Sequence, residues 1–390
     1  MLVLPQLAPL LQRSAFTICR FYAKPTPKGT KISSASNDTM KQVHQESLKY
    51  LNPNCMVKVI SDTFVKVRSA DVHDYPNGDV FIAQLRGGPA KNCPASMDIR
   101  VSDDESSVEV IVKKLTENTM DFHCELAVPI KASLEICSKS GVNVSKIYGD
   151  ILKLRAEKYI AVAEVKSEII DVASVDGNIV CLGLLLGKKT KVETKNNGHI
   201  ILDKLQGDEI LCKTDSGNIS TSCCYVESST FETNNGLLDL KNIHKTTNVL
   251  VHRDGNLKMS GVHGNLKVDF NGNSMELQLS ELTGDNCIRA KDAKSSIINI
   301  SEEIENTTSI TANLVDCNDS SITLDSSLQH LSSGLNEDKQ SFTWPIDKEH
   351  AHKLQIFGKN SLILGKSSWS DMLRLHMTKS ANNNKNNNNF

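Results

Sequence analysis

Acidic side chains recur beside glycine in the middle of this 390-residue sequence, and a pair of such carboxylates could cleave a glycosidic bond. Glycoside hydrolysis needs its two carboxyl groups about 5 to 5.5 Å or about 6.5 to 9.5 Å apart. Asp176 and Asp254 occupy equivalent places in the repeat described below, but four coils separate them, on the order of 19 Å at the spacing of neighbouring strands. Asp215 is one residue out of line with both. The sequence therefore predicts no catalytic residue and no enzyme.

Histidine could supply a metal ligand or a general base. His252 falls on a line of residues that we expect to point inward, beside Thr233. One interpretation is a metal ligand or general base that acts with His263 or His244, and the other is a hydrogen-bonded interior histidine. The interior histidine is the interpretation that we favour.

Two shorter groups could also react. His350 and His352 could chelate a metal with a third ligand, or they could lie on the surface. Cys223 and Cys224 have no basic neighbour in STSCCYVES that would lower a thiol pKa, so we expect core or corner residues. The 11 cysteines include no CxxC pair, and no phosphate-binding or nucleophile motif occurs. We therefore expect no metal and no cofactor.

A glycine preceded by a small polar residue returns at nearly constant intervals, and this repeat must position any such group. The spacings are 21, 19, 19 and 19 residues along the series Gly177, Gly198, Gly217, Gly236 and Gly255. A fixed period of this length is typical of solenoids. We interpret these glycines as corners between two faces, where a positive φ would favour glycine.

The residues around each glycine keep a common register. Three apolar lines run through the coils: Ile179, Ile200, Ile219, Leu238 and Leu257; Leu184, Leu205, Cys224, Ile243 and Val262; and Val172, Val192, Cys212, Phe231 and Leu250. Another inward line reads Ser174, Thr194, Thr214, Thr233 and His252, and an outward line reads Glu193, Lys213, Glu232 and Val251. Residues two apart on a strand share a face, and equivalent strands stack on successive coils. The pattern predicts an all-β, right-handed, three-sided parallel β-helix (β-solenoid) of about 18–21 residues per coil.

Changes in composition divide the chain into six parts. The linker could contain one short helix around residues 38–50. The predicted parts are a presequence (1–22), a linker (23–55), the first strands of the solenoid (56–125), the repeat solenoid (126–330), a C-terminal cap or last strands (331–378) and a disordered Asn-rich tail (379–390).

The first residues resemble a mitochondrial targeting segment. Five Lys and Arg residues precede the first acidic residue, Asp38, which is typical of a transit peptide. The order Arg20, Phe21, Tyr22 and Ala23 resembles the site that the matrix processing peptidase cuts. The alternative is a secretory signal with LVLPQLAPLL as its apolar core, but its charges follow the core. We expect a mitochondrial matrix protein, with secretion as the alternative.

Charge and hydropathy limit the partners. The formal net charge of −2 gives no basic surface for nucleic acid. The longest apolar run, IVCLGLLLG at residues 179–187, is too short to cross a bilayer, so we expect no integral membrane segment. An unknown protein partner is expected, whereas the sequence does not indicate the oligomeric state.

The middle of the chain resembles a known protein family in the segments DVASVDGNIV, KTDSGNIS and TNNGLLDL and in FHCELAVPI before them. The family that these segments resemble is the putative-adhesin domain family. The whole chain also resembles the animal proteins called family with sequence similarity 185. The resemblance covers roughly residues 56–325 and implies a β-solenoid without assigned catalytic residues. Together with the residues it predicts a non-catalytic scaffold or protein-interaction surface. The alternative is a secreted or surface protein that binds carbohydrate or degrades polysaccharide.

Overall fold

The computed structural model describes residues 42–88, 93–116, 122–315, 320–346 and 349–366. All of them belong to the second of two compact units, Lys41–Phe390. The predicted presequence, its cleavage residues Arg20, Tyr22 and Ala23, and the Asn-rich tail lie outside the described residues.

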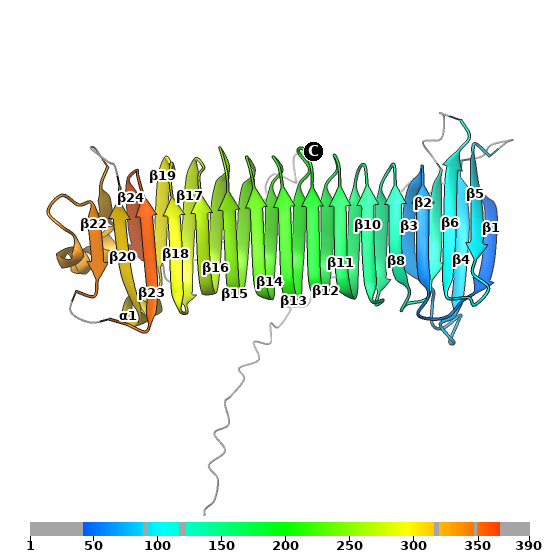
Figure 1. Cartoon of the computed structure of the whole chain (residues 1–390), viewed down its shortest axis with the longest axis horizontal. Coiled ribbons are helices and arrows are strands. Elements are labelled where there is room, and N and C mark those ends of the chain that lie inside the picture. The colour runs from blue at the N-terminus through cyan, green and yellow to red at the C-terminus, as the bar shows by residue number, and fades with distance from the viewer. Residues whose placement is uncertain (1–41, 89–92, 117–121, 316–319, 347–348, 367–390) are drawn as a thin grey trace, which may run out of the picture. The chain divides into compact units, whose positions relative to one another are not determined.

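Strands make up most of the described chain (Figure 1). They are β1 Gln42–Tyr50, β2 Met56–Ser61, β3 Phe64–Ser69, β4 Val80–Gly87, β5 Ala95–Val101, β6 Ser107–Lys114, β7 His123–Val128, β8 Ser133–Ser138, β9 Val142–Ile147, β10 Ile151–Ala156, β11 Ile160–Ser174, β12 Ile179–Thr194, β13 Ile200–Thr214, β14 Ile219–Thr233, β15 Leu237–Val251, β16 Asn256–Phe270, β17 Ser274–Leu282, β18 Asp285–Ala290, β19 Ser295–Ile300, β20 Thr308–Leu314, β21 Ile322–Leu324, β22 Ser341–Trp344, β23 His352–Gly358 and β24 Leu362–Lys366. The helical elements are α1 Glu302–Thr307 and the 3-10 helix η1 Ser326–Gly334.

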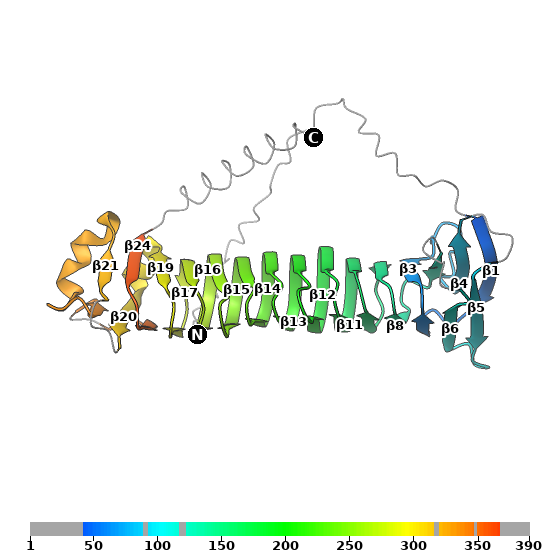
Figure 2. The same ribbon diagram turned by 90° about the horizontal axis from the view of Figure 1, so that it is seen from above.

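From β8 to β19 the strands pair in parallel with their equivalents one turn of the chain away, and we call each turn a coil (Figure 2). Partner residues are separated by between 17 positions, as in Val262 and Leu279, and 21 positions, as in Ile179 and Ile200, and 18 to 20 positions are the usual separation. The structure thus confirms the predicted all-β, parallel β-helix and its coil length.

Each coil buries side chains from three segments. In β11 these are Ile160 with Val162, then Val165, then Ile170 with Val172 and Ser174. The first predicted column is a continuous interior stack, because Ile200, Ile219, Leu238 and Leu257 are paired in register and are at most 2% exposed. Side chains of one type can follow one another along such a column because each coil presents the same environment to the next.

Each of the other four predicted lines is wrong by one residue at one position. Leu185, not Leu184, continues the second line, because the pairing of β12 with β13 shifts between Cys181 and Leu184. Val249, not Leu250, pairs with Phe231, and Val251, not His252, pairs with Thr233. The pairing of β14 with β15 shifts between Tyr225 and Ser228, so that coil is one residue shorter than expected. The outward line therefore continues from Glu232 to Leu250, and Val251 is buried.

The repeated glycines lie at corners, but the reason that we expected for them is wrong. None of Gly177, Gly198, Gly217, Gly236 and Gly255 is among the residues with positive φ. Instead each lies against the backbone of the previous coil: a β-carbon on Gly217 would overlap the carbonyl oxygen of Gly198, and one on Gly236 would overlap that of Gly217. Close approach of the stacked backbones, and not the φ angle, excludes other residues here.

A threonine three residues before the corner explains the rest of the motif at Gly217 and Gly236. The side-chain oxygens of Thr214 and Thr233 accept hydrogen bonds from the N–H groups of Gly217 (3.1 Å) and Gly236 (2.9 Å). Thr214 also donates to the carbonyl oxygen of Gly198 at 3.1 Å. The hydroxyl thus satisfies buried backbone groups that the turn leaves without partners.

At both ends of the stack, the order of the coils departs from the order of the chain. β2 and β3 lie between β6 and β7 on one side and β8 and β9 on the other. At the other end, β23 and β24 lie between β18 and β19 on one side and β20 and β21 on the other. Antiparallel strands complete the ends, with β1 on β4 and β22 on β20. The helix expected around residues 38–50 is wrong, because β1 begins at Gln42.

Candidate interaction surface

The first part of β12, residues 179–187, is apolar on its outside as well as its inside. Strands with one buried face usually alternate apolar and polar residues. In β12 the outward residues Val180, Leu182, Leu184 and Leu186 accompany the buried Ile179, Cys181 and Leu185. The backbone register adds Ala161 and Ala163 of β11 and Ile201 of β13 beside them. We call Ala161, Ala163, Val180, Leu182, Leu184, Leu186 and Ile201 the apolar patch.

The apolar patch is open to solvent. Leu182 is 58% exposed and Ile201 is 44% exposed, and the other five side chains are partly exposed. The equivalent outward positions further along the stack are polar, as in Ser220, Asp239 and Lys258. A contiguous exposed apolar area that is confined to one place marks an interaction site more often than single exposed residues do.

Charges of both signs border the apolar patch. Lys166 and Gln206 flank Leu186 in the register, and Lys204 flanks Leu184. Glu164, whose φ is 53°, bends the coil beside Ala163. A polar rim around an apolar centre is the usual composition of a protein interface.

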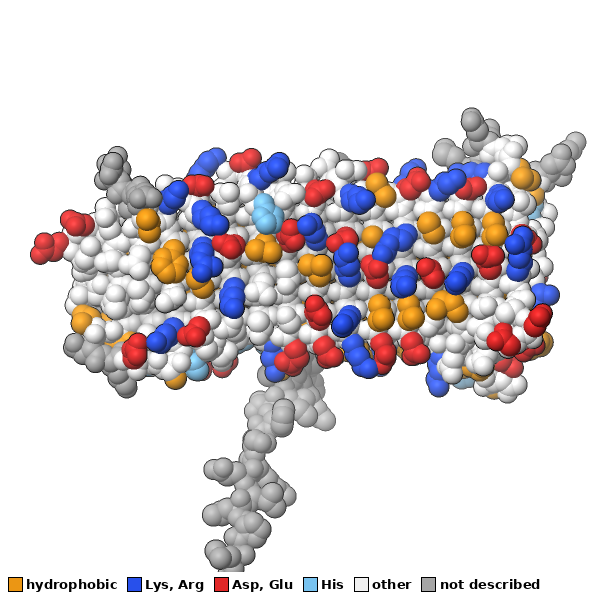
Figure 3. All heavy atoms as spheres, viewed as in Figure 1, with side chains coloured by type: hydrophobic (Ala, Val, Ile, Leu, Met, Phe, Trp, Pro, Cys, Tyr) orange, Lys and Arg blue, Asp and Glu red, His pale blue; other side chains and the backbone are white. Residues whose placement is uncertain are grey.

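One face of the stack carries many charged residues. Figure 3 shows Lys and Arg side chains interspersed with Asp and Glu, and with hydrophobic side chains, in rows that run along the stack. Arg155 pairs with Asp171, and Lys213 pairs with Glu232 at 2.8 Å. Alternating signs on successive coils neutralise one another locally, so these rows indicate no polyanion or polycation as ligand.

A second outward line brings together aromatic and histidine side chains. Tyr225, His244 and His263 lie in register on β14, β15 and β16, with ring centroids 4.9 Å apart at each step. The two imidazole rings are nearly parallel, at 8°. His263 Nδ1 lies 3.6 Å from Glu281 Oε2 on β17. Burial, and then the neighbouring His263, lower the pKa of His244 below its ordinary value.

His252 does not join this line, and neither interpretation made from the sequence is right. It is exposed at the turn that follows β15, and its Nε2 lies 3.1 Å from Glu232 Oε1. The register shift described above moves Val251 into the inward line that we predicted for His252. His244 and His263 do meet each other, as stacked outward rings.

Three of the residues that we considered as reactive, His350, His352 and Cys224, take part in hydrogen bonds or are buried. His352 Nδ1 accepts a hydrogen bond from the N–H of Gly284 at 3.1 Å, and the N–H of His350 donates to Ser309 Oγ at 2.8 Å. Burial raises the pKa of Cys224 to about 12, which keeps the thiol protonated and unreactive. Within the described ranges, no group of three or more His, Cys, Asp or Glu side chains could hold a metal ion.

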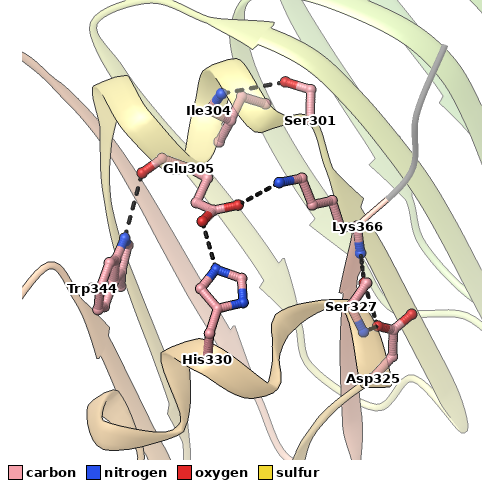
Figure 4. Close-up of polar contacts among 8 residues, drawn as sticks. All are labelled: Ser301, Ile304, Glu305, Asp325, Ser327, His330, Trp344 and Lys366. Atoms are coloured by element: carbon pink, nitrogen blue, oxygen red, sulfur yellow. Dashed lines mark hydrogen bonds and ion pairs between the residues drawn. The ribbon is translucent and has the colours of Figure 1, made fainter.

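A partly buried polar network joins the elements at the C-terminal end (Figure 4). The carboxylate of Glu305 on α1 accepts hydrogen bonds from Lys366 Nζ at 2.9 Å and His330 Nε2 at 2.7 Å. Its backbone carbonyl accepts one from Trp344 Nε1 at 3.4 Å. Burial alone would raise the pKa of Glu305, but the hydrogen bonds from His330 and Lys366 outweigh burial and lower it. The carboxylate of Glu305 therefore ties β24 and η1 to α1, and its backbone carbonyl ties β22 to α1.

An open groove of about 420 Å³ lies beside Trp344 at the same end. Its lining combines an aromatic ring with hydroxyl, amide and charged groups, including Ser309, Thr311, Thr343, Lys353 and Gln355. Lys353 pairs with Glu349 at 3.1 Å across part of the lining. The groove can offer hydrogen bonds and a small apolar wall to a ligand.

The apolar patch was not predicted, although the sequence contains its signal. We interpreted IVCLGLLLG only as a run too short to be a membrane span. In the described part of the chain, no helix has the length and apolar character that a membrane span requires. A strand that is apolar at every position has to be buried on both faces or exposed on one. Because the other coils alternate, this run could have been assigned to an exposed face of the solenoid.

Comparisons with known proteins identify no family. No family model matches the chain. A crystal structure of a putative cell adhesion protein from Clostridium sporogenes is similar at 8% identity and a TM-score of 0.20, covering 83% of this chain and 99% of that chain. A putative adhesin from Parabacteroides distasonis is similar at 11% identity and a TM-score of 0.34, covering 66% of this chain and 92% of that chain. Identities and TM-scores this low assign no activity or ligand to this chain.

Proposed function

We propose that this protein is a non-catalytic β-solenoid scaffold that binds a protein partner through the apolar patch. The observation that carries the proposal is that residues 179–187 of β12 are apolar on both faces, whereas Ser220, Asp239 and Lys258, which follow Ile201 in the outward row, are polar. Exposing Leu182 and Ile201 to water is unfavourable, and burial against a partner would remove this cost. A partner that fits has an apolar centre and a rim of mixed charge.

The experiment compares two variants by proximity labelling in intact cells. Leu182→Ser with Ile201→Ser disrupts the apolar patch, and Ser220→Ala with Lys258→Ala alters the same outward row further along the stack. We expect the first variant to lose neighbours that the wild type and the second variant both label. Unchanged labelling by a folded Leu182→Ser, Ile201→Ser variant would contradict the proposal.

Delivery to the mitochondrial matrix is part of the proposal. It is supported by the five basic residues before Asp38 and by the order Arg20, Phe21, Tyr22 and Ala23. Membership of the putative-adhesin domain family, and kinship with the family with sequence similarity 185 proteins, are likewise proposals that the repeat motifs support. Sequencing of the mature amino terminus tests the location: a first residue at Ala23 supports the matrix, whereas glycans on Asn143 or Asn218 would show secretion.

A carbohydrate-binding protein outside the cell is the second candidate, and the groove beside Trp344 favours it. Hydroxyl and amide side chains such as Thr311 and Gln355, next to an aromatic ring, can hydrogen-bond and pack against a sugar. Binding to a glycan array that is lost in a Gln355→Ala variant would favour this candidate over the scaffold. The apolar patch variant would bind glycans as the wild type does.

A further inference from the structure

The coil formed by β23 and β24 fills a gap between two coils that precede it in sequence. The chain runs from β19 through α1 directly into β20, but β19 and β20 belong to coils that are not neighbours in the stack. β23 pairs in parallel with β18 and β20, and β24 pairs in parallel with β19 and β21. We call the space between these coils the slot and residues 352–366 the inserted segment.

The slot matches the side chains of the inserted segment. Leu354, Ile356, Leu362 and Leu364 point into the core and are at most 3% exposed. A β-carbon on Gly365 would come within 2.9 Å of Asp325 Oδ2 and would also overlap Asn299 Oδ1, so both side chains would have to move. The apolar side chains and the small residue of the inserted segment thus fit the slot as it stands.

The slot also carries polar groups that are aimed at the backbone of the inserted segment. Asn286 is 1% exposed, and its Nδ2 donates to the carbonyl oxygen of Lys353 at 3.1 Å. In the other direction, Asn360 Nδ2 donates to the carbonyl oxygen of Ala293 at 2.7 Å. A buried amide that addresses an incoming backbone is a feature of a binding site for an extended strand.

We propose that the slot is a strand-acceptor site that takes the inserted segment from a second copy of this chain as well as from its own. The walls of the slot are joined to each other by α1, so they do not depend on the inserted segment for their connection. The pairings, the buried side chains and the Asn286 bond involve the segment itself, and a segment from another copy would form all of them. Exchange of an identical element between copies is a low-cost route to a dimer. This proposal is independent of the apolar patch, which lies on β11 to β13.

One native cysteine allows a direct test on the full chain. Cys287 in the slot wall is paired with Gln355 on one side and with Lys267 on the other. Neighbouring strands are about 4.8 Å apart, and this separation lies within the Cα range of disulfides. The donor carries Gln355→Cys and Cys287→Ser, and the acceptor is the wild type with a different tag. The matched control donor carries Lys267→Cys and Cys287→Ser, because Lys267 lies in the continuous part of the stack.

After the two copies are incubated together and oxidised, we expect a disulfide-linked heterodimer with the first donor and none with the control donor. Peptide mass spectrometry should map the disulfide to the introduced thiol of the Gln355→Cys donor and the native Cys287 of the acceptor. Absence of that heterodimer, or equal yields from both donors, would overturn the proposal.

A second measurement needs no Cys287 substitution. Differently tagged wild-type copies should co-purify after incubation, whereas an oxidised Gln355→Cys variant, locked to its own Cys287, should not. Co-purification that survives this lock would also overturn the proposal.

Discussion

The α-carbon of Gly217 packs so close to the carbonyl oxygen of Gly198, its equivalent one coil earlier, that a β-carbon on Gly217 would overlap that oxygen. The overlap is with backbone on a neighbouring coil, which cannot move without disturbing the parallel pairing on both sides. A Gly217→Ala substitution should therefore destabilise the protein by about 3 kcal/mol, at the upper end for overpacking. The measurement is the free energy of unfolding in urea.

Gly358→Ala is the control for this prediction. A β-carbon on Gly358 would come closest to the end of the Leu314 side chain, at 3.3 Å, and this side chain can rotate. We expect a change of about 1 kcal/mol or less. Equal effects of the two substitutions would contradict close backbone approach as the reason for glycine at the corner.

The interior column predicts a large effect at Ile219. Its side chain is 0% exposed and lies between Ile200 and Leu238. Ile219→Ala should reduce the free energy of unfolding by about 2–5 kcal/mol, because the rigid coils on either side cannot close the cavity. Leu182→Ala on β12 removes an exposed side chain and should change stability by about 0.5 kcal/mol or less. A small effect at Ile219 would mean that the column is not tightly packed.

The stacked histidines predict a dependence of stability on pH. Burial, and then His263 and Lys245, lower the pKa of His244 below 6.5, while Glu281 acts in the opposite direction. The unfolded chain therefore takes up a proton on this residue at a higher pH than the folded chain. This contribution to stability is complete above about pH 6.5 and declines as the pH falls toward the folded pKa.

A His244→Phe variant should lose part of this decline while keeping the ring stack. The measurement is the difference in free energy of unfolding between about pH 7.5 and about pH 5.5, on either side of the ordinary histidine pKa, for wild type and variant. If the variant declines as steeply as the wild type, His244 does not contribute.

We expect the carboxylate of Glu305 to stabilise β24 of the inserted segment against local opening. Glu305→Gln replaces the carboxylate that accepts hydrogen bonds from Lys366 and His330. Amide hydrogen exchange in β24 should become about tenfold faster, the factor that about 1.4 kcal/mol represents. Glu302→Gln, on the exposed side of the same helix, should leave the exchange unchanged.

We also expect the stability of the C-terminal end to fall at acid pH, because the Glu305 carboxylate becomes protonated there. The hydrogen bonds from His330 and Lys366 exceed the effect of burial and lower the pKa of Glu305 below 4.5. Its contribution to stability is present above about pH 4.5 and is lost as the pH falls through the folded pKa. In wild type, exchange in β24 should accelerate in this window, and a Glu305→Gln variant that accelerates equally would show that another group is responsible.

The architecture could be predicted because equivalent residues of successive coils share one environment. The glycines at the corners and the column from Ile200 to Leu257 follow directly from that periodicity. A register counted by fixed intervals fails where a coil gains or loses a residue. That happens around Gly183, whose φ is 68°, and between Tyr225 and Ser228. The first slip displaced one predicted line by one position, and the second displaced three.

The ends of the stack and the interaction surface could not be predicted in the same way. Sequence order suggests that consecutive coils are neighbours, whereas β2, β3, β23 and β24 are inserted one coil inward. The periodicity of the sequence cannot show that a strand is inserted out of order, because the apolar pattern of an inserted strand is the same as that of its neighbours. The apolar patch could not be predicted from the repeat because it departs from it. Leu182 and Leu186 occupy positions that are polar in most coils.

The insertion of β2 and β3 affects how a nascent chain can fold. Both neighbours of this coil are made after it, so it leaves the ribosome with two open edges and no template. It can pair on both sides only after β8 and β9, which end at Ile147, have emerged. A β-helix whose first coil was also its outermost could grow coil by coil during translation. Here the earliest strands have to wait, and chaperones that bind exposed strand edges would protect them until then.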